Sequence, residues 1–161
     1  MLREEKIDSR SLIKGHPLHP ALIHFPVATL LLLVITDICY VISIDPFWGK
    51  AGFYLSTTGL LFGVLGSLPG AIDVFTVKRI RRIVSAWAHG LLAVMTLSLA
   101  TLNVMLRLGD DPAEQIMPWG LYVSVLTGVM INITGSLGAR LVYEYGIGVD
   151  VVQKDEHLVD P

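Results

Sequence analysis

Long apolar runs alternate with short polar connectors along this chain. Each run is about 20 residues or longer and mostly apolar, which is the length that a helix needs to cross a bilayer. We therefore predict an all-α polytopic membrane protein, an antiparallel bundle of four transmembrane helices joined by "DPFWGKAG", "KRIRR" and "RLGDDPAEQIM". The predicted spans are about residues 20–44, 53–77, 83–106 and 118–142.

The segments outside the spans are short and polar. We expect residues 1–15 to form a polar cytoplasmic arm, residues 16–145 to hold the four-helix transmembrane domain, and residues 146–161 to form a cytoplasmic tail. The arm has mixed charge and no small-residue cleavage site follows it, so we expect the first span to be retained and not removed as a signal peptide. The sequence has no close internal repeat, although spans of similar length leave room for an old duplication of two helices.

The composition supports a membrane protein. The 161 residues are 53% hydrophobic and only 16% charged, with a mean hydropathy of +0.63. A net charge of -2 provides no basic surplus for nucleic acid, which we therefore exclude as a partner. The single cysteine, Cys39, lies inside an apolar run, so a disulfide framework and a cysteine-based metal site are excluded as well.

Lysine and arginine gather in the N-terminal arm and in the second connector. The third connector is acidic apart from Arg107, and the first holds only Lys50. Short loops rich in lysine and arginine stay on the cytoplasmic side, so we expect both termini and the second connector to be cytoplasmic. Trp48 and Trp119 would then lie at the outer interface, where tryptophan is enriched.

Small residues mark one face of the second span. Glycines recur there at steps of four, three and four residues, and an aspartate continues the stripe three residues later. Small residues allow either a neighbouring helix or a flat cofactor to approach closely, and the pattern alone does not decide between the two. The stripe consists of Gly59, Gly63, Gly66, Gly70 and Asp73.

The third and fourth spans also carry polar or small stripes, which we expect to face the bundle interior. Asp37 lies farther along the first span, and we place it nearer the outer leaflet and away from the face of His24. A hydrogen bond to Asn103 or Thr101 and a functional role are equally good interpretations of Asp37. The stripes are Ser85, His89, Thr96, Asn103 and Arg107 in the third span, and Ser124, Gly128, Asn132, Gly135 and Ala139 in the fourth.

Counting depth at about 1.5 Å per residue from the cytoplasmic ends brings ionisable groups from all the spans into one layer. Ionisable residues in hydrocarbon are costly, so they usually have a partner or a function. We place this layer in the cytoplasmic leaflet. It contains His24, Asp73, His89, Arg140 and Glu144.

Two histidines of this layer predict a cofactor. His24 and His89 lie on different helices at matching depth, which is an arrangement that can bind b-type haem through two axial imidazoles. The glycine stripe would give the porphyrin room. Arg82, Arg81 and Arg140 are candidates to bind its propionates.

The other polar groups leave alternatives open. His19 and His16 are alternative haem ligands or support for one, and Asp73 would orient a ligand or relay a proton. A non-haem transition metal held by His19, His24 and His89, with Asp73, fits the same residues. A proton-handling protein, or a structural subunit whose polar layer only joins the helices, fits them too.

The end of the fourth span has a simpler interpretation. Arg140 and Glu144 are four residues apart and are predicted to pair on one helix face. Gly146 and Gly148 are then expected to end the helix. His157 belongs to the polar tail, where we expect it to be solvated and without a role.

The chain resembles the bacterial membrane family catalogued as domain of unknown function 2231. The resemblance rests on "GHPLHPALIHFPVA", "GAID", the histidine early in the third span and "RLVYEYGIGV", and it covers about residues 15–149. It implies a four-span domain of the bacterial inner membrane without an assigned reaction. It also maps the family's motif residues to His16, His19, His24, Asp73 and His89.

Some relatives in that family are joined to Rieske iron-sulfur or cytochrome c domains, and this implies a role in electron transfer. We expect the present chain to carry no fused redox domain. Besides the lipid bilayer, its expected partner is therefore a separate redox protein of the Rieske or cytochrome c type, or a quinone.

Overall fold

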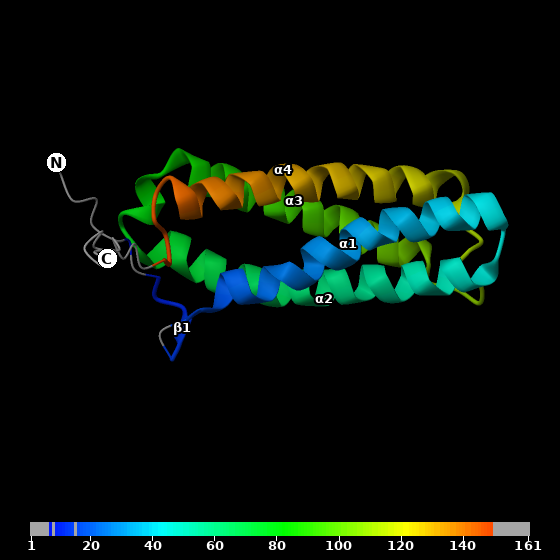
Figure 1. Ribbon diagram of the computed structural model, residues 1–161, viewed down its shortest axis with the longest axis horizontal. Coiled ribbons are helices and arrows are strands. Elements are labelled where there is room, and N and C mark those ends of the chain that lie inside the picture. Colours follow the sequence, from blue (N-terminus) through cyan, green and yellow to red (C-terminus); the bar gives the residue numbers. More distant parts are fainter. Residues whose placement is uncertain (1–6, 8, 15, 150–161) are drawn as a thin grey trace, which may run out of the picture.

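The computed structural model describes residues 7, 9–14 and 16–149. Within these residues the chain forms an antiparallel bundle of four long helices, as predicted (Figure 1). The long helices are α1 Leu18–Ser43, α2 Pro46–Thr76, α3 Val84–Leu106 and α4 Leu121–Tyr143. The short elements are strands β1 Leu12–Ile13 and β2 His16–Pro17, the 3-10 helix η1 Ile80–Arg82 and the π-helical turn η2 Ile116–Gly120.

The two ends of the bundle differ. We call the end where α1 begins and α4 ends the terminal end, and the opposite end the far end (Figure 1). At the far end Asp45 starts α2 early, because its carboxylate accepts the Phe47 backbone N–H at 2.9 Å and Pro46 occupies the first helical turn. The segment "DPFWGKAG", which we predicted as a connector, therefore belongs mostly to α2.

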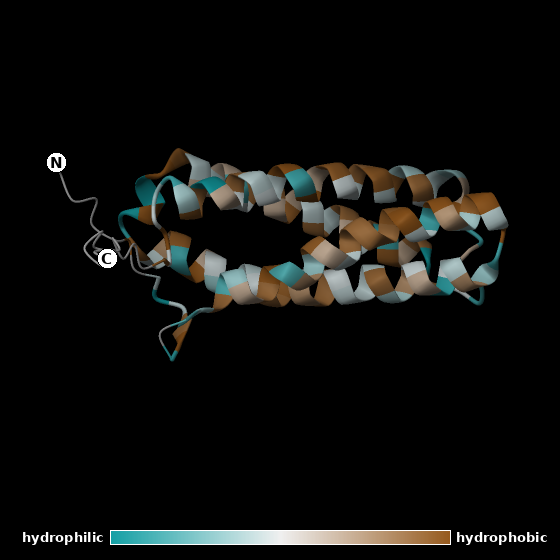
Figure 2. Cartoon of the chain, in the orientation of Figure 1, coloured by the Kyte–Doolittle hydropathy of each residue, from teal (hydrophilic) through white to brown (hydrophobic). Residues whose placement is uncertain are grey.

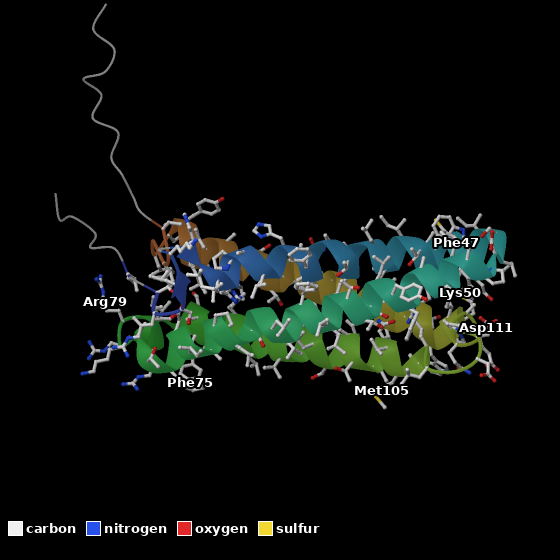
Figure 3. The ribbon with its side chains drawn as sticks, turned by 90° about the horizontal axis from the view of Figure 1, so that it is seen from below. Phe47, Lys50, Phe75, Arg79, Met105 and Asp111 are labelled. Carbon is white, nitrogen blue, oxygen red and sulfur yellow. The ribbon has the colours of Figure 1, made fainter. Side chains whose placement is uncertain are left out.

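The outside of the bundle is apolar. Large hydrophobic side chains on every long helix are exposed, including Leu32, Leu61, Val94 and Val129. Figure 2 shows hydrophobic residues along the bundle and hydrophilic ones mainly at its ends, and Figure 3 places Lys50 and Asp111 at the far end and Arg79 at the terminal end. Such a surface is compatible with surrounding lipid. Four segments are each long and apolar enough to cross a membrane: α1, α2, α3 and Ile116–Tyr143. The protein is an integral membrane protein.

The middle of the bundle has an apolar core. Leu30 and Leu33 of α1 contact Ala100 of α3 and Ile131 of α4, and all these side chains are buried. We call this set the central apolar layer. It separates the polar groups near the terminal end from those near the far end.

The glycine stripe of α2 receives side chains of neighbouring helices. A Cβ atom added at Gly59 would lie 2.7 Å from Leu30, and one at Gly63 would lie 2.5 Å from Leu97. Gly66 faces Ile23 in the same way. The stripe therefore packs helices along most of its length, which decides the question that the sequence left open.

The end of α4 agrees with the prediction. The Arg140 guanidinium donates to both Glu144 carboxylate oxygens at 2.9 and 3.0 Å, on an exposed face. These hydrogen bonds lower the pKa of the Glu144 carboxyl, so the pair stays ionised at neutral pH. Gly146 and Gly148 follow with positive φ values of 63° and 73°, where glycine is favoured, and they end the helix.

Candidate functional site

Two histidine rings lie next to each other near the terminal end. His19 lies in the first turn of α1 and His89 in the second turn of α3. Their ring centres are 5.9 Å apart and their planes are nearly perpendicular, at 89°. Both side chains are half-buried in the bundle. We call them the histidine pair.

Backbone carbonyls fix the protonation of both rings. His19 Nδ1 lies 2.8 Å from the Gly66 carbonyl oxygen, and His89 Nδ1 lies 3.0 Å from that of Thr134. A carbonyl only accepts, so each Nδ1 carries the hydrogen and each neutral ring keeps its lone pair on Nε2. No hydrogen bond to either Nε2 is found among the described residues. Both lone pairs can therefore bind an electrophilic ligand such as a metal.

Glycines make room for both rings in matching places. A Cβ atom at Gly70, four residues after Gly66, would lie 3.0 Å from His19 Nδ1. A Cβ atom at Gly138, four residues after Thr134, would lie 3.1 Å from His89 Cε1. The hairpin of α1 and α2 thus positions its histidine as the hairpin of α3 and α4 does.

This correspondence extends along the whole bundle as an internal repeat of geometry. A spacing of 70 residues relates His19 to His89, and the same spacing relates Asp37 to Arg107. A spacing of 68 residues relates the carbonyl acceptors Gly66 and Thr134 of α2 and α4, and also relates the fully buried Ser56 and Ser124. The histidines, the serines and the glycines Gly70 and Gly138 are identical pairs, but they are isolated positions, so no close repeat is visible in the sequence. Sites in repeat-built membrane proteins often lie at the interface between the repeats, as the histidine pair does.

The structure does not bring His24 to His89. The His24 side chain is exposed on the outside of α1, whereas Pro26, Leu30 and Asp37 define the buried face of that helix. His24 follows His19 by five residues, a rotation of about 140° that turns it away from the interior. The predicted pairing of His24 with His89 is therefore replaced by the pairing of His19 with His89.

The remaining candidates lie apart from the pair. His16 is exposed in β2, opposite Ile13 of β1, and Arg82 is exposed in η1. Arg140 binds Glu144, as described above. His157 lies outside the described residues. Among the residues that the structure describes, no group of three or more His, Cys, Asp or Glu side chains could hold a metal ion.

Asp73 anchors the segment before α1 and does not contact the histidine pair. Its carboxylate accepts the Ser9 hydroxyl at 2.6 Å and the backbone N–H groups of Arg10 and Ser11 at 2.8 and 3.3 Å. The Asp73 side chain is buried, and these donors satisfy it. We predicted that Asp73 orients a ligand or relays a proton; in the structure its partners are all in this segment.

Replacing Asp73 by asparagine is expected to loosen that segment. In the wild type, the donors share two carboxylate oxygens, whereas the asparagine amide has only one acceptor oxygen. At least one buried hydrogen bond is therefore lost, which costs about 1–3 kcal/mol of stability. Hydrogen exchange of the Arg10 and Ser11 amides should then accelerate by about tenfold. Mass spectrometry measures this, and Glu144→Gln is the control at an exposed carboxylate. Unchanged exchange in Asp73→Asn would refute the anchoring role.

A fully buried polar cluster lies near the far end, and the sequence did not predict its central contact. Arg107 Nη2 donates to both Asp37 carboxylate oxygens at 2.7 and 2.5 Å, and Ser124 Oγ donates to Asp37 Oδ2 at 2.5 Å. Asn103 Oδ1 accepts from Arg107 and lies 3.1 Å from Ser124 Oγ, and Asn103 Nδ2 donates to Thr127 at 3.3 Å. We call these five residues the far polar cluster.

Neither Asn103 nor Thr101, the partners that we expected for Asp37, donates a hydrogen bond to its carboxylate. Asn103 belongs to the same cluster but reaches Asp37 through Arg107 and Ser124. Thr101 is exposed and donates to the Leu97 carbonyl of its own helix. The Arg107 side chain is only 1% exposed, which agrees with its place on the inward stripe of the third span, although Arg107 also began our predicted third connector.

Comparison with known proteins identifies a family without an assigned reaction. The family model described as "Predicted membrane protein (DUF2231)" matches residues 15–151. The match spans the histidine pair, Asp73 and the far polar cluster. No curated protein and no solved structure matches the chain.

Proposed function

The chain belongs to the family of predicted membrane proteins DUF2231, and from this premise we propose that it binds b-type haem for electron transfer. His19 and His89 would be the axial ligands. One observation carries the proposal: the two imidazoles lie 5.9 Å apart, each with Nδ1 bound to a backbone carbonyl and Nε2 without a hydrogen-bond partner among the described residues. Metal-bound histidines characteristically donate their other N–H in this way.

The spacing of the rings fits this ligand. Bonds of about 2.0–2.1 Å from a metal ion to each Nε2 would put the ring centres about 6 Å apart. The centres of His19 and His89 are 5.9 Å apart. Gly70 and Gly138 hold the rings close to α2 and α4, since a Cβ atom would lie 3.0 Å from His19 Nδ1 at Gly70 and 3.1 Å from His89 Cε1 at Gly138.

The donor set favours haem over a bare metal ion. A protein-bound transition metal usually takes three or four protein ligands, and the described residues offer no such group. A porphyrin brings its own nitrogens, so two axial histidines are enough. When bound, the haem supplies a one-electron change at its iron.

The chain's own residues would then orient the ligand. The Gly66 and Thr134 carbonyls hold each ring in position and make its Nε2 more basic. The exposed Arg82 and the Arg140 side chain lie toward the terminal end, where the propionates of a haem would contact water and positive charge.

The electron partner would be a separate Rieske or cytochrome c type protein, or a quinone. With both termini cytoplasmic, the site would lie in the inner leaflet of a bacterial membrane.

The central apolar layer supports electron transfer over proton conduction. Leu30, Leu33, Ala100 and Ile131 separate the histidine pair from the far polar cluster. A proton path needs continuous hydrogen-bonding groups or water, whereas an electron does not. A purely structural role is the second candidate, because the bonds of His19 to α2 and of His89 to α4 already link helices.

An absorption spectrum tests the proposal. Protein purified in detergent from cells supplied with haem precursor should show a Soret band, and pyridine haemochrome analysis should give about one haem b per chain. Elemental analysis of the same sample should give iron in equal amount. Protein without a Soret band would refute haem binding: another metal in stoichiometric amount would then favour a non-haem site, and no metal would favour the structural role.

A further inference from the structure

The far polar cluster contains one buried polar atom without a partner. Arg107 Nε is the only buried side-chain nitrogen or oxygen among the described residues that makes no hydrogen bond. The other two guanidinium nitrogens are bound within the cluster. The Arg107 side chain is 1% exposed, and burying a charged group with one donor unpaired costs folding free energy. We therefore expect an acceptor to bind Nε–H.

The space in front of Gly52 of α2 lies beside this atom. A Cβ atom added to Gly52 would lie 3.3 Å from Asp37 Oδ1, 3.3 Å from Thr36 Oγ1 and 3.4 Å from Arg107 Nε. Three polar atoms from α1 and from the end of α3 thus converge in front of the Gly52 Cα, and an added Cβ would be in tight contact with all of them. The Thr36 side chain is itself buried.

The bonding state of these atoms specifies the ligand. Arg107 Nε–H is a donor. Asp37 Oδ1 is an acceptor, and Thr36 already donates its hydroxyl hydrogen to the Leu33 carbonyl at 2.8 Å, so its oxygen is left to accept. The place therefore needs one small molecule that accepts one hydrogen bond and donates two. We infer that a single water molecule is bound here, between Arg107 Nε, Asp37 Oδ1 and Thr36 Oγ1.

Charge excludes the ions of similar size. An anion would lie against the Asp37 carboxylate, and a cation would lie against the Arg107 guanidinium. A neutral water makes about three hydrogen bonds in a typical buried site, which is the number available here.

The matching place in the other hairpin already holds an oxygen atom. Gly120 lies 68 residues after Gly52, the spacing that relates α2 to α4. A Cβ atom at Gly120 would lie 2.7 Å from the Gln115 carbonyl oxygen and 3.8 Å from Arg107 Nη1. On that side the place is filled by the chain's own carbonyl oxygen, which accepts the Gly120 N–H at 2.9 Å, and on the Gly52 side the water fills it.

A variant series at position 52 tests the inference through thermal unfolding in detergent. Gly52→Ala should expel the water and lower Tm by several degrees, although alanine in place of glycine usually favours a helix. Gly52→Ser should recover most of that loss, because its hydroxyl can accept from Arg107 Nε and donate to Asp37 in place of the water. The control is Gly90→Ala in α3, where an added Cβ meets nothing within 4 Å, and its Tm should stay equal or rise.

The outcomes separate a bound water from an empty or merely crowded space. A Tm increase in Gly52→Ala like that in Gly90→Ala would mean that the space is empty and would overturn the inference. A larger loss in Gly52→Ser than in Gly52→Ala would mean crowding, and would overturn it too. An experimental structure in nanodiscs that resolves buried waters should show one within 3.3 Å of Arg107 Nε, about the hydrogen-bond limit. Its absence at that resolution would refute the site directly, even if both variants fail to fold.

Discussion

Replacing Arg107 by alanine is expected to destabilise the folded bundle by about 3–5 kcal/mol, which is the usual cost of breaking a buried ion pair from one side. The variant leaves the Asp37 carboxylate inside the bundle without its counter-charge. It also removes donors from Asn103 and Asp37 at once. Unfolding by denaturant or heat in a fixed detergent measures the effect. The variant is expected to lose most of its folded yield.

Removing both charges should be far less harmful than removing one. The double variant Asp37→Leu with Arg107→Met leaves no unpaired charge in the interior, and buried ion pairs often exchange for apolar residues at little cost. We therefore expect it to recover most of the stability that Arg107→Ala loses. Arg140→Ala is the matched control at an exposed arginine–glutamate pair, where little change is expected. An Arg107→Ala variant as stable as Arg140→Ala would contradict the role of the far polar cluster.

The number and type of the helices could be predicted because each apolar run is long enough to cross a bilayer by itself. The start of α2 could not, since "DPFWGKAG" contains proline, lysine and glycine and looks like a connector. In the structure Asp45 caps the helix and Pro46 occupies its first turn. A polar helix start that extends past the apolar run gives no hydropathy signal.

The rotation of α1 was harder to predict than its length. This helix is apolar on all sides through "LLLLVI", so hydropathy does not mark its inner face. The sequence does hold one signal: Asp37 follows His19 by 18 residues, and Arg107 follows His89 by 18, or about five full turns in each helix. Each pair therefore shares a face. Had the buried charge of Asp37 been used to orient the helix, His19 and not His24 would have pointed inward.

The partners of Asp73 could not be predicted from helical spacing. Asp73 continues the glycine stripe, so we placed it with the histidines. Its donors come from Ser9, Arg10 and Ser11, more than 60 residues away in an irregular segment. Contacts between a helix end and a loop depend on the conformation of the loop, and helical periodicity in the sequence does not predict that conformation.

The histidine variants carry the largest expected functional effect. His19→Ala and His89→Ala should each reduce haem per chain by more than about tenfold, since even the loss of a group that only orients a metal ligand costs 10–100-fold. His24→Ala is the matched control, because its side chain lies on the same helix but outside the bundle. It should keep the wild-type Soret band and haem content. Pyridine haemochrome analysis of folded, monodisperse protein measures all three.

The pattern across the three variants distinguishes a ligand from a structural group. If the histidines only joined helices through the Gly66 and Thr134 carbonyls, His19→Gln would keep a side-chain N–H donor and would change stability little. A glutamine amide is a poor haem ligand, so under the haem proposal the same variant should stay folded and lose the Soret band. Loss of haem in His24→Ala together with its retention in His19→Ala would restore His24 as the partner of His89. The matching carbonyl and glycine in both hairpins lead us to expect the opposite.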